Sequence, residues 1–221
     1  MIRIFCLSFY LLCLCLVLPS AAQEEPTVQL EQIGPVCDPV TGCPAMISQT
    51  TFQGMDAYWL SDSKTQALVV PAIGRVMNYA FLNGDNWLWN AQLSEGNPPE
   101  RLGWKNWGGD KTWLAPQSDW PQLVGRNWPP DAAWDGQPFE AEVLSGGILR
   151  TTSEVSPVSG VRVIRDYWHD EKTGEFVIQQ SVEKVKGAPL KLSIWSVTQI
   201  APPDAVFVPL NPQSAYKNNF H

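Results

Sequence analysis

Alternation of apolar and polar residues along the second half of the chain constrains the fold more than any other feature. Between Phe176 and Glu183 the side chains alternate between two faces, and Val161–Trp168 shows the same period of two. That period is typical of β-strands with one buried face. Turn-forming residues lie at Ser145-Gly146, between the runs 139–144 and 147–153, and at 170–174, between the two alternating runs. No window carries the apolar stripe of a helix. We therefore predict an all-β protein, a large antiparallel β-sandwich.

The first half of the expected sandwich consists of shorter runs. Residues 55–60, 67–71 and 74–82 have the apolar character of strands, and Asn83-Gly84-Asp85 is a strong hairpin signal. Residues 93–138 differ, because they are rich in Gly, Pro, Asn and Asp and follow no sustained period. A connection of that length is uncommon in a compact domain and is usually functional or disordered.

The 93–138 segment is also where the tryptophans gather. It holds six of the 11 in the chain, at positions 104, 107, 113, 120, 128 and 134. Disordered segments are poor in aromatic residues, so we expect this one to be ordered and packed. It is therefore the leading candidate for a binding surface.

The N-terminus is typical of an export signal. Arg3 supplies a positive charge, Ile4–Leu18 is an apolar run, and small residues precede Gln23. We expect residues 1–22 to be a cleaved signal peptide, 23–50 a linker and 51–221 the sandwich domain. The alternative is a retained anchor, but the apolar run is shorter than the roughly 20 residues that span a membrane. The mature protein is thus predicted to be secreted or periplasmic, with no integral membrane segment.

Two cysteines remain once the signal is removed, Cys37 and Cys43. They lie in a turn-rich, proline-containing loop of the predicted linker. A redox-active pair usually has two intervening residues and a following helix, whereas two close thiols in an exported chain favour a structural disulfide. We therefore expect a small disulfide clip between Cys37 and Cys43.

Charge and composition exclude several functions. The formal net charge is −7, whereas binding to nucleic acid or to an anionic membrane surface needs clustered lysine and arginine. The chain has only two histidines, which argues against a histidine-rich metal site. It also lacks a P-loop, a dinucleotide fingerprint and a GxSxG motif. We therefore expect no cofactor, no metal and no nucleic-acid partner.

The run from Trp104 to Trp113 carries the clearest binding signature. Ligand sites combine aromatic walls with a few polar groups, and indole faces suit the apolar faces of sugar rings. The candidate sugar-binding residues in this run are Trp107, Asp110, Lys111 and Trp113. The alternative is that these indoles cap one end of the core, since tryptophan is commonly buried.

Three residues elsewhere are further candidates. Arg75 lies on an otherwise apolar strand and has the donors of a sugar anchor, although an outward-facing strand arginine would look the same. Histidine titrates near neutral pH, so His169 is a candidate catalytic acid or base; its charged turn is also typical of an exposed histidine. Glu154 is a candidate acid, with no second carboxylate at a spacing that would mark a catalytic pair.

The order of several motifs resembles a known family. Gly74-Arg75-Val76 on an early strand precedes the Trp107–Trp113 run, and Trp128-Pro129-Pro130 and two strand-like runs, 155–165 and 190–200, follow. From residue 54 to residue 200 the sequence resembles an exported bacterial family of galactose mutarotase-like proteins, in the aldose 1-epimerase superfamily. The resemblance implies a supersandwich whose concave face binds a carbohydrate.

In aldose epimerases, a His-Gly-Gly segment and a second histidine on a later strand flank the sugar. The resemblance places Trp107-Gly108-Gly109 at the first of these positions and Trp195 at the second, which adds Trp195 to the candidate sugar-binding residues. Epimerisation needs a general acid and a general base, and an indole can stack but cannot transfer protons in these roles. We therefore predict an exported carbohydrate-binding protein without mutarotase activity.

Two alternatives stay open. One is an active aldose 1-epimerase-like or other sugar-modifying enzyme that uses His169 or Glu154. The other is a non-catalytic structural domain of the cell envelope, with the tryptophans purely in its core. The related sandwiches also continue for more strands, including one that carries an acidic base. We therefore expect a sandwich that is incomplete at its C-terminus, with an exposed sheet edge.

Overall fold

A computed structural model of the protein describes residues 46–91, 100–101, 103–207 and 212–213. The predicted signal peptide (1–22), most of the predicted linker and the predicted clip between Cys37 and Cys43 lie outside the described residues. The first strand begins at Met46, a few residues before the domain boundary expected at residue 51.

A six-stranded antiparallel sheet, of order β1-β2-β3-β4-β7-β12, forms one layer of the fold. Its strands are β1 (Met46–Phe52), β2 (Met55–Ser61), β3 (Thr65–Val70), β4 (Arg75–Phe81), β7 (Asp110–Ala115) and β12 (Ser193–Thr198). A short 3-10 turn, η1 (Pro71–Ile73), joins β3 to β4. Gly74 ends this turn at a positive φ of 63°, and a Cβ there would lie 2.5 Å from the ring of Phe139. Gly74 therefore lets the two sheets meet closely at this corner.

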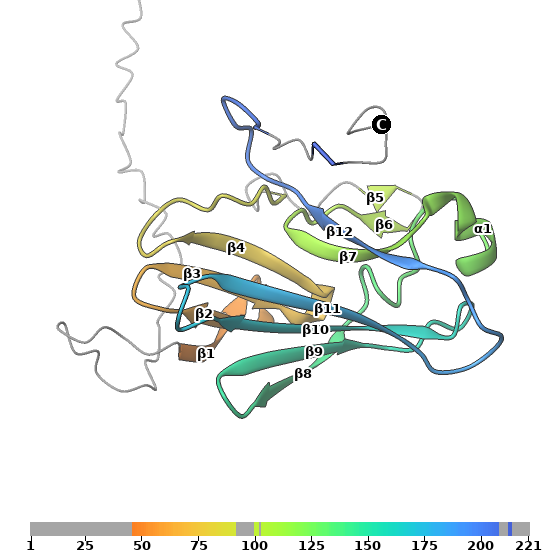
Figure 1. The fold of residues 1–221 in the computed structure, drawn as a ribbon, viewed down its shortest axis with the longest axis horizontal. Helices are drawn as coiled ribbons and strands as arrows, with labels where there is room; N and C mark the ends of the chain where they lie inside the picture. Colours follow the sequence, from red (N-terminus) through yellow and green to blue (C-terminus); the bar gives the residue numbers. More distant parts are fainter. Residues whose placement is uncertain (1–45, 92–99, 102, 208–211, 214–221) are drawn as a thin grey trace, which may run out of the picture. The chain divides into compact units, whose positions relative to one another are not determined.

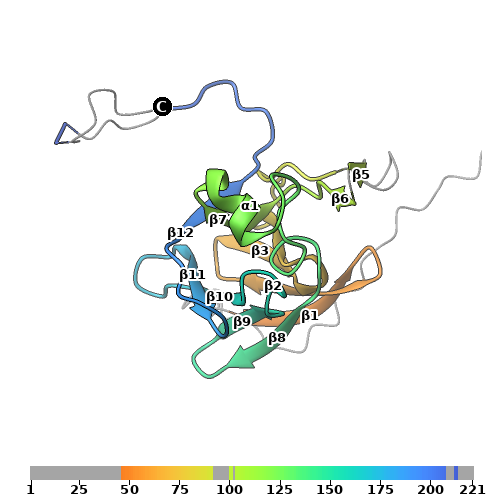
Figure 2. The same ribbon diagram turned by 90° about the vertical axis from the view of Figure 1, so that its right-hand side faces the viewer.

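A four-stranded antiparallel sheet, of order β11-β10-β9-β8, forms the second layer. Its strands are β8 (Phe139–Leu144), β9 (Ile148–Ser153), β10 (Val161–His169) and β11 (Phe176–Lys184). Figures 1 and 2 show this meander lying against the six-stranded sheet. The predicted antiparallel β-sandwich is confirmed.

Apolar side chains from both layers fill the space between them. Leu60, Val69 and Val76 of the six-stranded sheet pack with Leu149 and Tyr167 of the four-stranded sheet. Every second residue of β9 is buried, as the period of two in the sequence predicts. Burial of such side chains is the main source of stability for a sandwich of this kind.

Two glycines allow β7 to pair within the six-stranded sheet. Gly108 and Gly109 have positive φ angles of 84° and 66°, and a Cβ on either would collide with neighbouring backbone. Glycine at both positions lets β7 approach β4, to which it pairs at Val76 and Asp110. The expectation that residues 93–138 are irregular throughout is therefore corrected, because a sheet strand runs through their middle.

Residues 103–138, the larger described part of this region, are called the tryptophan segment below. Besides β7 it contains β6 (Trp104–Lys105), which pairs with β5 (Glu100–Arg101), the 3-10 turn η3 (Gln117–Asp119) and the one-turn helix α1 (Trp120–Leu123). Trp120 and Trp134 are 0 % and 1 % exposed, so the segment is packed into the protein. Among the described residues, no helix has the length and apolar character needed to cross a membrane.

Candidate functional site: a tryptophan-walled pocket

The two faces of β7 have different surroundings. Asp110 and Thr112 face the other sheet, where Asp110 pairs with Arg165 of β10 and Thr112 donates a hydrogen bond to Gln180 of β11. Because side chains alternate along a strand, Lys111, which lies between these two residues, points to the outer face of the six-stranded sheet. This outer face is nevertheless buried, because the rest of the tryptophan segment covers it.

Asp135 links the tryptophan segment to the six-stranded sheet. Its side chain is fully buried, and one carboxylate oxygen is ion-paired with the guanidinium of Arg75. Its other oxygen accepts hydrogen bonds from Trp113 Nε1 at 2.7 Å and from Trp104 Nε1 at 3.0 Å. Arg75 also donates to the carbonyl of Gly108 at 2.7 Å. One buried carboxylate thus fixes the position of two indole rings and is the counter-ion of a buried cation.

The indoles form one aromatic cluster around Trp113. Their edge-to-face contacts with Trp113 have centroid distances of 5.2 Å for Trp195, 5.5 Å for Trp120, 5.8 Å for Trp128 and 6.3 Å for Trp104. These separations lie in the favourable range for aromatic pairs. Trp113 is buried, whereas Trp104 and Trp128 are partly exposed. The cluster therefore has a buried centre and an accessible edge.

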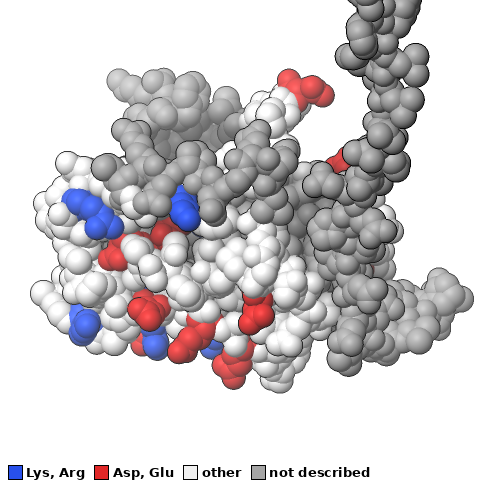
Figure 3. Space-filling model, turned by 180° about the vertical axis from the view of Figure 1, so that it is seen from behind, with Lys and Arg blue, Asp and Glu red and all other residues white. Residues whose placement is uncertain are grey.

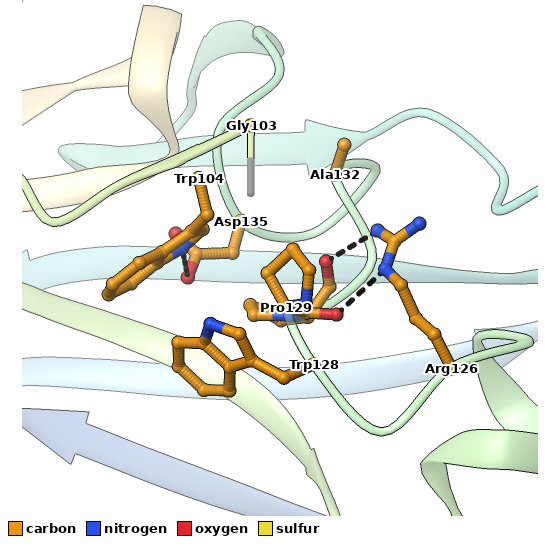
Figure 4. Close-up of a pocket in the computed structure, with 8 residues that line it drawn as sticks. Gly103, Trp104, Arg126, Trp128, Pro129, Ala132 and Asp135 are labelled. Carbon is orange, nitrogen blue, oxygen red and sulfur yellow. Dashed lines mark hydrogen bonds between the residues drawn. The ribbon is translucent and has the colours of Figure 1, made fainter. Parts of the chain in front are cut away.

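A pocket opens at this accessible edge, with a volume of about 270 Å³. Its lining comprises Gly103, Trp104, Arg126, Trp128, Pro129, Pro130, Ala132 and Asp135. Figure 4 shows Trp104 and Asp135 on one side of Pro129 and Arg126 on the other. The guanidinium of Arg126 donates to the carbonyl oxygens of Pro129 and Pro130, at 3.0 Å each. A cation is therefore held in a fixed orientation at the rim of an aromatic pocket.

Lys111 is unusual because it is a buried lysine. It is 1 % exposed, its Nζ donates to Gln199 Oε1 at 2.7 Å, and it lies 5.3 Å from the centre of the Trp113 ring. Burial, together with the repulsion of Arg75, lowers the pKa of Lys111 from 10.5 to about 8. The surroundings of Lys111 therefore destabilise its charged form relative to a lysine in water.

The structure buries four of the six predicted sugar-binding residues on or next to β7. Arg75, Asp110, Lys111 and Trp113 are all buried, with exposed fractions between 0 % and 7 %, and none of them lines the pocket. Their contacts are with one another, with Asp135 and with neighbouring strands. Of these four, Arg75 and Trp113 hold Asp135 in the wall of the pocket, whereas Asp110 bonds Arg165 and Thr198 and Lys111 bonds Gln199.

The other two predicted sugar-binding residues lie apart from the pocket lining. Trp195 on β12 is 38 % exposed and touches Trp113, its partner on β7. Trp107 packs against a different cluster, which includes Met77 and Ile73. Trp195 therefore extends the aromatic cluster, whereas Trp107 belongs to the core beside it.

The two candidate catalytic residues do not come together. His169 ends β10 and is 5 % exposed, with Nε2 3.3 Å from the Leu60 carbonyl and Nδ1 3.7 Å from Asp62. Glu154 is exposed and directly follows β9, which pairs antiparallel with β10. The two residues therefore lie toward opposite ends of β10. His169 also borders a second cavity, of about 410 Å³, beside Trp168 and Gly146.

The sequence did not mark the residues that line the pocket as a binding site, although Trp128-Pro129-Pro130 is one of the motifs that carry the family resemblance. Trp104 and Trp128 were counted among the clustered tryptophans, but nothing in their spacing marked them as the accessible pair. Arg126 and Asp135 stand in turn-like surroundings, Gly125-Arg126-Asn127 and Asp135-Gly136, where polar residues are ordinary. Among the described residues, no group of three or more His, Cys, Asp and Glu side chains is placed to hold a metal ion.

Comparisons with known proteins give little beyond this geometry. No family model matches the sequence, and a search of curated proteins finds no match. Among solved structures, a 4-alpha-glucanotransferase from Thermococcus litoralis is similar with a TM-score of 0.44 and 14 % identity. The similarity covers 69 % of this chain and 28 % of the length of that enzyme. The resemblance to galactose mutarotase-like proteins stays a prediction.

Proposed function

We propose that this protein binds a carbohydrate, and that one sugar ring enters the pocket beside Trp104 and Trp128. The observation that carries the proposal is a pair of partly exposed indoles, 5.0 Å apart between ring centres, at the wall of an open pocket. Aromatic walls with a few fixed polar groups are the usual composition of small-ligand sites. The predicted export signal fits this proposal, with the protein secreted or periplasmic.

The rigidity of the indoles supports binding. Trp104 is held by its hydrogen bond to Asp135, and both rings pack edge-to-face on Trp113. Side chains that are already fixed lose little conformational freedom when a ligand arrives, which favours affinity. The pocket volume of about 270 Å³ lies just below the roughly 300–1,000 Å³ of drug-sized sites, which suits one ring better than a long chain.

The pocket offers little for acid–base catalysis. Asp135 is its one carboxylate among the described lining residues, and both of its oxygens already accept hydrogen bonds. His169 borders the other cavity. Epimerisation would need a proton donor and a proton acceptor at the sugar, so this geometry favours binding over mutarotation.

Calorimetric titration tests the proposal against glucose, galactose, mannose, glucuronic acid, galacturonic acid and their short oligosaccharides. We expect at least one to bind, and Trp128→Ala to lower its affinity by about tenfold or more, since a tenfold change is about 1.4 kcal/mol. The matched control is Trp168→Ala, which removes a partly exposed tryptophan at the other cavity. An absence of binding, or equal losses in the two variants, would contradict the proposal.

A further inference from the structure

The polar side chains at the pocket offer more free hydrogen-bond donors than free acceptors. Asp135 is the carboxylate of the lining, and its oxygens are taken by Arg75, Trp104 and Trp113. The side-chain groups that remain are donors. Trp128 Nε1 has no hydrogen-bond partner among the described residues, and Figure 4 shows this nitrogen on the side of the ring nearest Asp135. A ligand here meets N–H groups more readily than it meets carboxylate oxygens.

Arg126 supplies most of these donors. A guanidinium has five N–H groups in a fixed, planar fork. Two of them, on Nε and Nη2, are used by the carbonyls of Pro129 and Pro130. These bonds hold one edge of the fork and leave free the edge between Nη1 and Nη2. Two parallel N–H groups on one edge match the two oxygens of a carboxylate.

No carboxylate of the described residues pairs with that edge. In the part of the chain that the structure describes, none of the ion pairs involves Arg126, and the side chain is exposed. This exposed and oriented guanidinium, unpaired among the described residues, lies at the rim of a pocket that two indoles line. The pocket is therefore complementary to a ring that bears a carboxylate.

From these three observations we infer that the ligand is an acidic sugar of the uronic acid type, a deepening that rests on the proposed sugar site. The ring lies at the indole end of the pocket, near Trp104 and Trp128, and the carboxylate binds the free edge of Arg126 at the other end. Figure 4 shows these groups on opposite sides of Pro129. No covalent step is involved.

The negative net charge of the protein limits the length of an acidic ligand. The chain carries a formal net charge of −7, so a long polyanion would be repelled. On the described surface in Figure 3, lysines and arginines lie among acidic side chains, without a continuous basic track. The inferred ligand is therefore a uronic acid monosaccharide or the end of a short oligosaccharide.

The test compares galacturonic and glucuronic acid di- and trisaccharides with their methyl esters, by calorimetric titration of the full chain at pH 7. Esterification removes the charge and keeps the ring. We expect the acids to bind about tenfold more tightly than the esters, the scale of one hydrogen-bonded charge pair. Because this comparison uses the unchanged protein, it does not depend on the folding of a variant.

A variant then assigns the effect to Arg126. Arg126→Gln is expected to lower the affinity for the acids by about tenfold and to leave the affinity for the esters within about twofold. Arg162→Gln, an exposed arginine on β10, is the matched control and should change neither. Equal binding of acids and esters would overturn the acidic-sugar inference while leaving the sugar pocket in place. Failure of every sugar to bind would overturn both.

Discussion

Two arginine–carboxylate ion pairs, one on the outer face of each sheet, differ in their exposure to solvent. Arg75 and Asp135, on the six-stranded side, are both 0 % exposed in their side chains. Arg162 and Glu183, directly opposite each other on β10 and β11, are 37 % and 48 % exposed. The first pair lies under the tryptophan segment, whereas the second faces solvent.

The difference shows what the tryptophan segment does for the fold. Folding over one face of the six-stranded sheet, it adds a layer of indoles and converts charged side chains into buried partners. On the four-stranded sheet, no described segment covers Arg162 and Glu183 in this way. The pocket lies at an accessible edge of this segment, beside Trp104 and Trp128.

Removing the charge of Asp135 should have the largest effect on stability. Asp135→Asn keeps the size of the side chain but leaves the Arg75 cation buried without a counter-ion. Breaking a buried pair in this way costs about 3–5 kcal/mol, and we expect that loss in the free energy of unfolding. Urea unfolding, followed by tryptophan fluorescence, measures it.

The matched control is Glu183→Gln in the exposed pair. Exposed ion pairs contribute roughly 0–1 kcal/mol, so the free energy of unfolding should change by less than about 1 kcal/mol. The comparison between the two faces fails if both variants lose the same stability, or if Asp135→Asn is as stable as the unchanged protein.

A smaller effect is expected from Lys111 as the pH rises. Burial lowers the pKa of Lys111 to about 8 in the folded protein, while the lysine of an unfolded chain titrates near 10.5. Between these values the unfolded state binds more protons, so stability should increase with pH, by up to about 3 kcal/mol. Urea unfolding at several pH values from 7 to 10 measures this slope.

Lys111→Met isolates the lysine from other titrating groups. Burial raises the pKa of Tyr167, which gives a slope of the opposite sign above pH 10, but that slope is shared by both proteins. The difference between the two pH profiles should therefore report Lys111 alone. Identical profiles would show that folding does not lower the pKa of Lys111.

The sandwich could be predicted because its strands repeat a local pattern. Alternation in β10 and β11, and glycine-containing turns between strands, are properties of neighbouring residues. β7 could not be predicted in this way. Its first three residues, Asp110, Lys111 and Thr112, are polar, and they are buried because of partners far along the chain, such as Arg165 and Gln199.

The site could be predicted only in outline. The clustering of tryptophans pointed to the correct segment, because aromatic residues are rarely concentrated in an irregular region without packing. It could not separate the buried Trp113 from the accessible Trp128, since Asp135 and the covering chain decide which ring is enclosed. Such contacts join residues that no local pattern connects.

The most direct test of the sugar pocket observes the indole N–H groups themselves. In a nitrogen-15-labelled protein, each tryptophan gives one indole signal, and Trp→Phe variants assign them. On titration with the sugar that binds most tightly, the signals of Trp104 and Trp128 should shift, while those of the buried Trp120 and of Trp168 at the other cavity stay in place. Saturable shifts at Trp168, with Trp104 and Trp128 unchanged, would contradict the account.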